Sequence, residues 1–146
     1  MIDMRIALLS SCTIDLLAKP FAAALEAEGL HPSFWIGGFG QYYQDVLNPD
    51  SGLYKHEPAI VILYLDGNDL FQDILDIPFD FLAEDRRRRA LRRAGEVAAI
   101  AEAISERLPQ ATLLVNTVAV DPLNALVGLE YNSEYSLQVA VNAYNG

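Results

Sequence analysis

The chain reads IALLSSCTID over residues 6–15, and this stretch decides its fold. Met4 to Leu9 form an apolar run that predicts a buried parallel strand, and Asp15 to Glu28 carry apolar residues at helical spacing before Gly29 supplies a C-cap. The polar turn between them lies at the carboxyl end of the strand, the edge at which open α/β sheets bind their ligands. Because this turn contains Cys12, the only cysteine of the chain, it is the first candidate for a reactive site.

Strands and helices continue to alternate after this turn. A β-branched apolar run from Ala59 to Leu65 has the length and composition of a central parallel strand. The other expected elements are strands over 32–36 and 111–116, a long helix over 81–108 that Pro109 ends, and the opening of a helix over 133–145. This alternation predicts right-handed crossovers and a three-layer α/β/α fold, in which a flavodoxin-like parallel sheet is covered by helices on both faces.

The composition predicts one globular domain over residues 1–146. Hydrophobic residues make up 52% of the chain, yet no apolar run reaches the roughly 18 residues of a membrane span. The N-terminus lacks the pattern of a secretory signal and a single cysteine cannot form an internal disulfide, so we expect a cytoplasmic protein. A net charge of −10 opposes binding to nucleic acid and to anionic membranes.

The basic residues are concentrated in one segment. Six of the ten lysines and arginines lie at positions 86–89, 92 and 93, directly after an acidic stretch. One interpretation is a solvated helix face with ion pairs such as Glu84 to Arg88 and Asp85 to Arg89. The other is a docking patch that steers an acidic partner protein. The sequence leaves both interpretations open.

Further polar residues follow the expected strands. Asp66, Asn68 and Asp69 come directly after the strand at 59–65, and polar residues at the end of such a strand point into the cleft at the edge of the sheet. The alternative is a Gly-Asn-Asp turn that only ends the strand. Asn116, at the end of the strand over 111–116, either lines a pocket or caps the strand end.

A glycine-rich segment, GGFGQYY at 37–43, follows the strand over 32–36 at the same edge of the sheet. Glycine allows the backbone to approach a ligand closely, but the segment is neither a P-loop nor a dinucleotide fingerprint, so nucleotides are not expected. His31 and His56 precede their strands and should lie at the opposite edge, which leaves Cys12 without a general base from these residues. Two separated histidines and one cysteine predict no metal site.

The turn at 10–13 resembles the first block of SGNH hydrolases, also called GDSL-type hydrolases. Ser10-Ser11-Cys12-Thr13 stands where those enzymes read Gly-Asp-Ser-Leu, so the resemblance implies that Cys12 is the nucleophile. Ser10 and Ser11 would be hydrogen-bonding residues of the turn, with Ser11 as a fallback nucleophile. Residues 66–69 are similar to the third block, Gly-x-Asn-Asp, although Asp66 replaces its first glycine. The resemblance implies oxyanion donors at the Asn68 side chain and at the backbone of Gly38 or Gly40.

One branch related to these hydrolases is more similar to this chain. Ser-x-Cys-Thr, together with FGQY at 39–42 and PDSGLY at 49–54, resembles the amino-terminal domain of FkbH-like proteins, which accompany acyl-carrier proteins in polyketide pathways. In those proteins this region continues into another strand and then into a haloacid-dehalogenase-type phosphatase domain. Because the sequence stops at Gly146 without a fifth strand, we expect it to be the amino-terminal part of a larger protein.

The resemblance implies an acyltransferase without a cofactor in these residues. Cys12 would accept a glyceryl group as a thioester and pass it to the phosphopantetheine thiol of an acyl-carrier protein, with the phosphatase domain as a second partner. Asp66, Asp69 and Asn116 would contribute to substrate binding. Transfer of an acyl group from one thiol to another is nearly isoenergetic, whereas its transfer from a serine ester to a thiol is uphill. The reaction therefore suits a cysteine better than a serine. The alternatives are an SGNH-type hydrolase of small esters and a non-catalytic module that docks a carrier protein.

Overall fold

The computed structural model describes residues 2–76, 83–119 and 137–146. Its contacts divide the chain into two compact units, of which the first contains the residues up to Leu65 and the segment Ile100–Asn116. The second contains Asp66–Ala99 and the described residues from Thr117 onward. The expectation of one domain over residues 1–146 stays a prediction.

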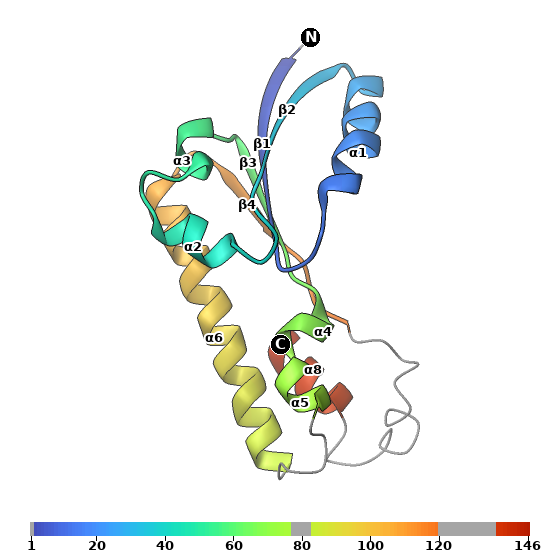
Figure 1. Cartoon of the computed structure of the whole chain (residues 1–146), viewed down its shortest axis with the longest axis vertical. Helices are drawn as coiled ribbons and strands as arrows, with labels where there is room; N and C mark the ends of the chain where they lie inside the picture. The colour runs from blue at the N-terminus through green and yellow to red at the C-terminus, as the bar shows by residue number, and fades with distance from the viewer. Residues whose placement is uncertain (1, 77–82, 120–136) are drawn as a thin grey trace. The chain divides into compact units, whose positions relative to one another are not determined.

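A parallel sheet of four strands forms the centre of the first unit (Figure 1). Its order is β2-β1-β3-β4 and every neighbouring pair is parallel, which confirms the predicted α/β class and the three-layer arrangement. The strands are β1 (Ile2–Ser10), β2 (Leu30–Ile36), β3 (Ile60–Tyr64) and β4 (Thr112–Val115). The first two begin two residues earlier than the sequence pattern predicts, because Ile2 pairs with Leu30 across the sheet.

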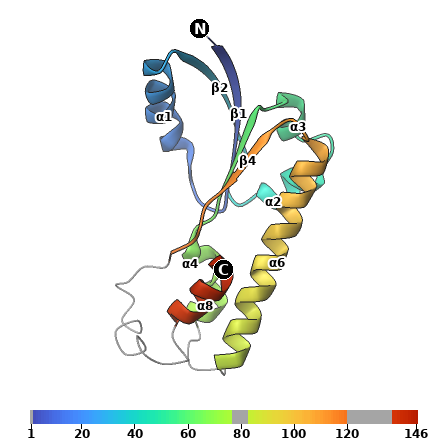
Figure 2. The same ribbon diagram turned by 180° about the vertical axis from the view of Figure 1, so that it is seen from behind.

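Helix α1 (Asp15–Ala27) covers one face of this sheet (Figures 1 and 2). Its Phe21 packs on Phe34 of β2 with the ring centroids 5.6 Å apart. Ile6 and Leu8, on the central strand β1, are almost fully buried in the same apolar cluster. The predicted amphipathic helix therefore packs Ala18, Phe21 and Leu25 against the sheet, where they are partly buried, while Leu16 and Leu17 stay exposed.

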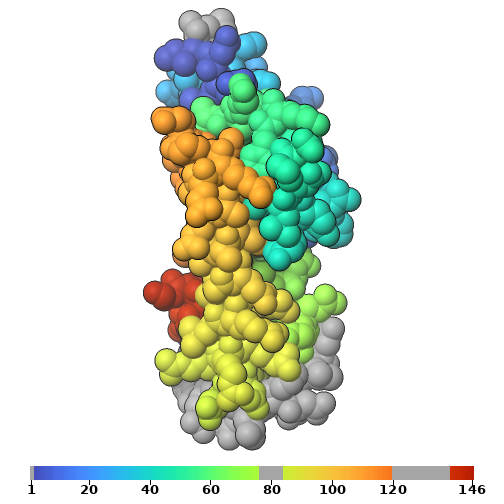
Figure 3. All heavy atoms as spheres, turned by 90° about the vertical axis from the view of Figure 1, so that its left-hand side faces the viewer, coloured from blue at the N-terminus to red at the C-terminus, as the bar shows by residue number. Residues whose placement is uncertain are grey.

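The other face of the sheet is covered by α2 (Tyr42–Leu47), α3 (Gly52–His56) and the last turns of α6 (Ala83–Arg107). Figure 3 shows the two short helices beside the carboxyl-terminal turns of α6. Arg107 fixes this arrangement, because its Nη1 donates to the carbonyl oxygens of Val46, at 2.7 Å, and Leu47, at 3.1 Å. Its guanidinium also lies over the Tyr54 ring, 5.3 Å from the centroid. Helices α2 and α3 were not predicted from the sequence, because they are shorter than two helical turns.

The second unit contains α4 (Gly67–Leu70), α5 (Gln72–Asp76), α8 (Leu137–Asn145) and the first part of α6. The buried Phe71 meets Tyr144 of α8 edge to face, with the ring centroids 5.6 Å apart. Asn145 donates from Nδ2 to the carbonyl of Val118, and its Oδ1 accepts the Val118 N–H. The start of α8 that the sequence predicts at Ser133 lies outside the described residues. None of the helices found in the described ranges is both long and apolar enough to span a bilayer.

Candidate active site

Hydrogen bonds at the end of β1 and in the turn after it position Cys12. Ser10 and Ser11 are buried, with 4% and 8% of their surface exposed. The Ser11 N–H donates to the carbonyl of Tyr64 at 3.2 Å, which ties the turn to the end of β3. The Cys12 N–H donates to Ser10 Oγ at 3.0 Å, and Cys12 Sγ lies 3.3 Å from the same oxygen. The turn therefore brings a partly exposed thiol and a buried hydroxyl together.

The direction of the hydrogen bond between Ser10 and Cys12 depends on the state of the sulfur. When the sulfur is a thiol, either atom can donate, but a thiolate can only accept. Ser10 Oγ already accepts the Cys12 N–H, so its own proton can be directed at the sulfur. Ser10 is therefore placed to stabilise a thiolate at Cys12, which is the species that attacks acyl groups.

An open, mainly apolar pocket of about 430 Å³ lies beside the thiol. Cys12, Thr13 and Tyr64 line one part of it. The rest is lined by residues at the start of α1, namely Ile14, Leu16, Leu17 and Pro20. Leu16 is 87% exposed, so this pocket presents apolar surface to solvent at the carboxyl edge of the sheet. Its volume is in the range that accommodates a small ligand. Among the residues that line it, Cys12 alone carries a sulfur atom.

The glycine-rich segment lies at the same edge of the sheet, as predicted. The Gly37 N–H donates to the carbonyl of Leu8 at 2.9 Å, which continues the pairing of β1 and β2. Gly40 has a φ of +64°, a conformation that favours glycine. Gly38 is exposed, and its carbonyl accepts the Gln41 N–H at 3.0 Å. The structure thus places Gly38 and Gly40 in the same unit as Cys12, while their role as oxyanion donors stays a prediction.

Asp45, on α2, is a partly exposed residue with one buried carboxylate oxygen, and no sequence pattern indicates it. Its Oδ2 is buried and has no hydrogen-bond partner among the described residues. A Cβ at Gly37 would come within 3.0 Å of this oxygen, so position 37 requires a glycine or a shift of Asp45. Burial raises the pKa of the Asp45 carboxyl above its ordinary value of 3.8. No local sequence signal marks this residue, because its burial depends on the loop after β2.

We expect Asp45→Asn to stabilise the protein at neutral pH by about 1 kcal/mol, since it removes a charge from a buried oxygen that has no partner in the described part of the chain. The folded-state pKa of Asp45 is raised, so the stability associated with its protonated form is complete below pH 3.8 and is lost as the pH rises through the raised value. The gain from Asp45→Asn should therefore shrink as the pH falls toward 4. Thermal unfolding from pH 4 to pH 8 measures this difference. Asp50→Asn, at an exposed carboxylate, is the control, and an equal gain there would contradict the assignment.

The remaining predicted site residues have structural contacts of their own. Asn116 forms two hydrogen bonds to the Leu65 backbone, with Nδ2 donating to the carbonyl at 3.0 Å and Oδ1 accepting the N–H at 2.8 Å. These contacts agree with the interpretation that Asn116 caps the end of its strand. Asp66 caps α4, since its Oδ1 accepts the Asn68 N–H at 2.7 Å. Asp66, Asn68 and Asp69 all belong to the second unit, so their predicted roles at the thiol stay predictions.

The two histidines lie where the sequence predicts, at the amino ends of the strands. His31 is the second residue of β2, and His56 Nε2 lies 3.1 Å from the carbonyl oxygen of Ser33. Neither residue lines the pocket beside Cys12. Within the three described ranges, no group of three or more histidine, cysteine, aspartate or glutamate side chains is arranged to hold a metal ion.

A solved structure has a similar fold. The N-terminal part of the protein BF1531 from Bacteroides fragilis, which contains a phosphatase domain and was crystallised in complex with Mg, matches with a TM-score of 0.77 at 14% sequence identity. The match covers 99% of the present chain and 36% of the BF1531 chain. No protein-family model and no curated protein matches the sequence. At this identity the likeness shows the fold alone.

Proposed function

We propose that Cys12 accepts an acyl group as a thioester and passes it to the phosphopantetheine thiol of an acyl-carrier protein, and that the acyl group is glyceryl, as in the FkbH-like proteins the sequence resembles. The observation that supports this most directly is the Cys12 thiol beside an open pocket of about 430 Å³, with Ser10 Oγ 3.3 Å from the sulfur. The similar fold of a phosphatase-containing protein agrees with a chain that works beside such a domain.

The proposed transfer consists of two displacements. The Cys12 thiolate attacks the carbonyl carbon of an activated glyceryl donor, a carbon–sulfur bond forms, and the leaving group departs with its electron pair. The carrier thiolate then attacks the same carbon, the bond to Cys12 breaks, and the sulfur of Cys12 leaves as a thiolate that Ser10 can stabilise. Because a thioester is exchanged for a thioester, the second displacement needs no further energy source.

The test is intact-mass spectrometry after incubation with glyceryl N-acetylcysteamine thioester, a donor that requires no partner domain. The wild type should gain one glyceryl group that hydroxylamine removes, and Cys12→Ala should gain none. Cys12→Ser should retain any glyceryl group as an ester when pantetheine is added, because returning it to a thiol is uphill, whereas the wild type should lose it. Rapid release of the wild-type adduct without an added thiol would favour the small-ester hydrolase. The absence of any adduct would overturn the proposal.

We expect Ser10→Ala to lower the rate at which iodoacetamide alkylates Cys12 at pH 7 by about fivefold, the equivalent of one hydrogen bond. Tyr64, which also lines the pocket, is the same in both proteins. Ser10→Thr should restore most of the rate. Equal rates in all three proteins at pH 7 would mean that Ser10 only stabilises the turn.

A further inference from the structure

The six clustered arginines, all on α6, have different environments. Arg86 is 3% exposed, whereas the side chains of Arg88 and Arg92 are 69% and 62% exposed. Arg89 is partly buried, and its Nη1 lies 2.7 Å from Asp73 Oδ2 on α5. The solvated-face interpretation of the sequence thus holds for some of these residues and fails for Arg86.

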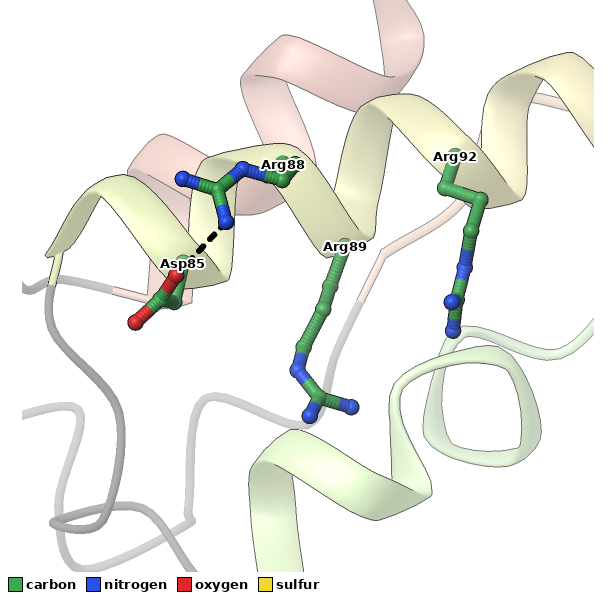
Figure 4. A pocket seen from close by; sticks show the side chains of 4 residues that line it. All are labelled: Asp85, Arg88, Arg89 and Arg92. Carbon is green, nitrogen blue, oxygen red and sulfur yellow. Dashed lines mark ion pairs between the residues drawn. The ribbon is translucent and has the colours of Figure 1, made fainter.

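Three of the arginines line one pocket in the second unit. Arg88, Arg89 and Arg92, which we call the arginine face, surround a volume of about 340 Å³ together with Asp85 (Figure 4). At about 100° per residue these four positions fall on the same side of α6, while Arg87 falls on the opposite side. Figure 4 shows Arg89 and Arg92 extending in the same direction from consecutive turns, with the Arg88 guanidinium turned toward Asp85.

The ion pairs of the exposed arginines are weak enough to be exchanged. Arg88 lies 3.1 Å from Asp85 and 3.4 Å from Glu84, and the second contact confirms a predicted pair. The ion pair of Arg92 with Glu96 is longer, at 3.7 Å. Exposed pairs of this kind contribute about 0–1 kcal/mol each. Carboxylates of a partner could therefore replace them at little cost.

The segment 84–96 is positively charged in an otherwise acidic chain. Residues 84–96 contain six arginines against three carboxylates, a net charge of +3. Because the whole chain carries −10, the remaining residues carry −13. An acidic protein is repelled by such a chain except at its positive segment, so the field would orient the approach of that protein.

We propose that the arginine face is the docking surface for an acidic carrier protein, a proposal that takes the identity of the partner from the proposed function. Guanidinium groups bind carboxylates in two-pronged pairs, so three of them on one helix face fit a helix that presents several aspartates or glutamates.

The test compares two charge reversals on the same helix. Arg92→Glu changes the arginine face, and Arg87→Glu makes the same change in net charge at an exposed position on the opposite side. The dissociation constant of a fluorescently labelled apo acyl-carrier protein is measured by anisotropy at low and high salt. We expect Arg92→Glu to weaken binding by about tenfold or more, Arg87→Glu by less than about threefold, and high salt to weaken wild-type binding. Arg92→Ala, with an unchanged circular dichroism spectrum, checks that the loss does not arise from unfolding.

Three results would overturn this proposal. Equal losses in the two reversals would show a general effect of net charge, and wild-type binding that salt does not change would exclude an electrostatic surface. Displacement of the carrier by millimolar inorganic phosphate would assign the pocket to a small anion. The formation of the Cys12 adduct from the N-acetylcysteamine donor does not involve the carrier. The docking proposal can therefore fail while the proposed function holds. The proposed function can likewise fail, by the absence of the adduct, while the carrier still binds at the arginine face.

Discussion

Leu63→Ala is expected to lower the free energy of unfolding by about 3 kcal/mol, because it removes a fully buried side chain from the centre of the sheet. Leu63 lies on β3, where it is paired in register with Leu9 of β1 and Val115 of β4. Substitution leaves a cavity between the sheet and its covering helices, and a packed interior closes such a cavity only in part. Urea unfolding followed by circular dichroism measures the effect as a lower midpoint with an unchanged slope.

Leu114→Ala is the matched control for this substitution. It makes the same chemical change on the adjacent strand β4, but Leu114 is 49% exposed. We expect a loss below about 1 kcal/mol there, since surface substitutions remove little packed area. If both substitutions cost the same, the assignment of Leu63 to the packed core and of Leu114 to the exposed surface would be wrong.

Asn116→Ala is expected to lower the free energy of unfolding by about 2 to 3 kcal/mol, which is a large effect for a polar residue near the surface. The amide forms two hydrogen bonds to Leu65, one to its N–H and one to its carbonyl. Leu65 is 1% exposed, so both backbone groups would lose their partner in a site that water reaches poorly. Thermal and urea unfolding should both report the loss, whereas the alkylation rate of Cys12 should change little.

Asn116→Asp separates the two hydrogen bonds. The aspartate keeps an oxygen that can accept the Leu65 N–H, but it sets a second oxygen against the Leu65 carbonyl. The protein should therefore be destabilised at neutral pH and recover part of its stability in acid, where a protonated carboxyl can donate. A variant whose stability does not depend on pH would contradict the two-point contact.

The regular part of the fold could be predicted from the sequence because its signals are local. The apolar run at 59–65 and the helical spacing at 15–28 each specify one element, and their alternation specifies a parallel sheet. The short helices α2 and α3 could not be predicted in this way. They are held by Arg107, more than 50 residues away, through Val46 and the Tyr54 ring, so no window of sequence around them contains the stabilising contact.

The candidate site shows the same division between local and distant signals. Cys12 could be identified because a strand, a polar turn and a helix start follow one another within ten residues. The contact of Ser10 with the sulfur spans two residues and fits the hydrogen-bonding role expected for that serine. The buried oxygen of Asp45 could not be predicted, since its burial depends on how the loop after β2 packs on β1.

By itself, the sequence determined the class of fold, the edge of the sheet at which a site can form, and the cysteine that occupies it, because hydrophobic period and turn chemistry act over a few residues. Only the tertiary structure decided that Asn116 pairs with Leu65, that Arg86 is buried, and that Arg92 lines a pocket. These outcomes depend on which distant backbone or side chain arrives beside a polar group. The cost of burying that group without a partner then fixes the arrangement.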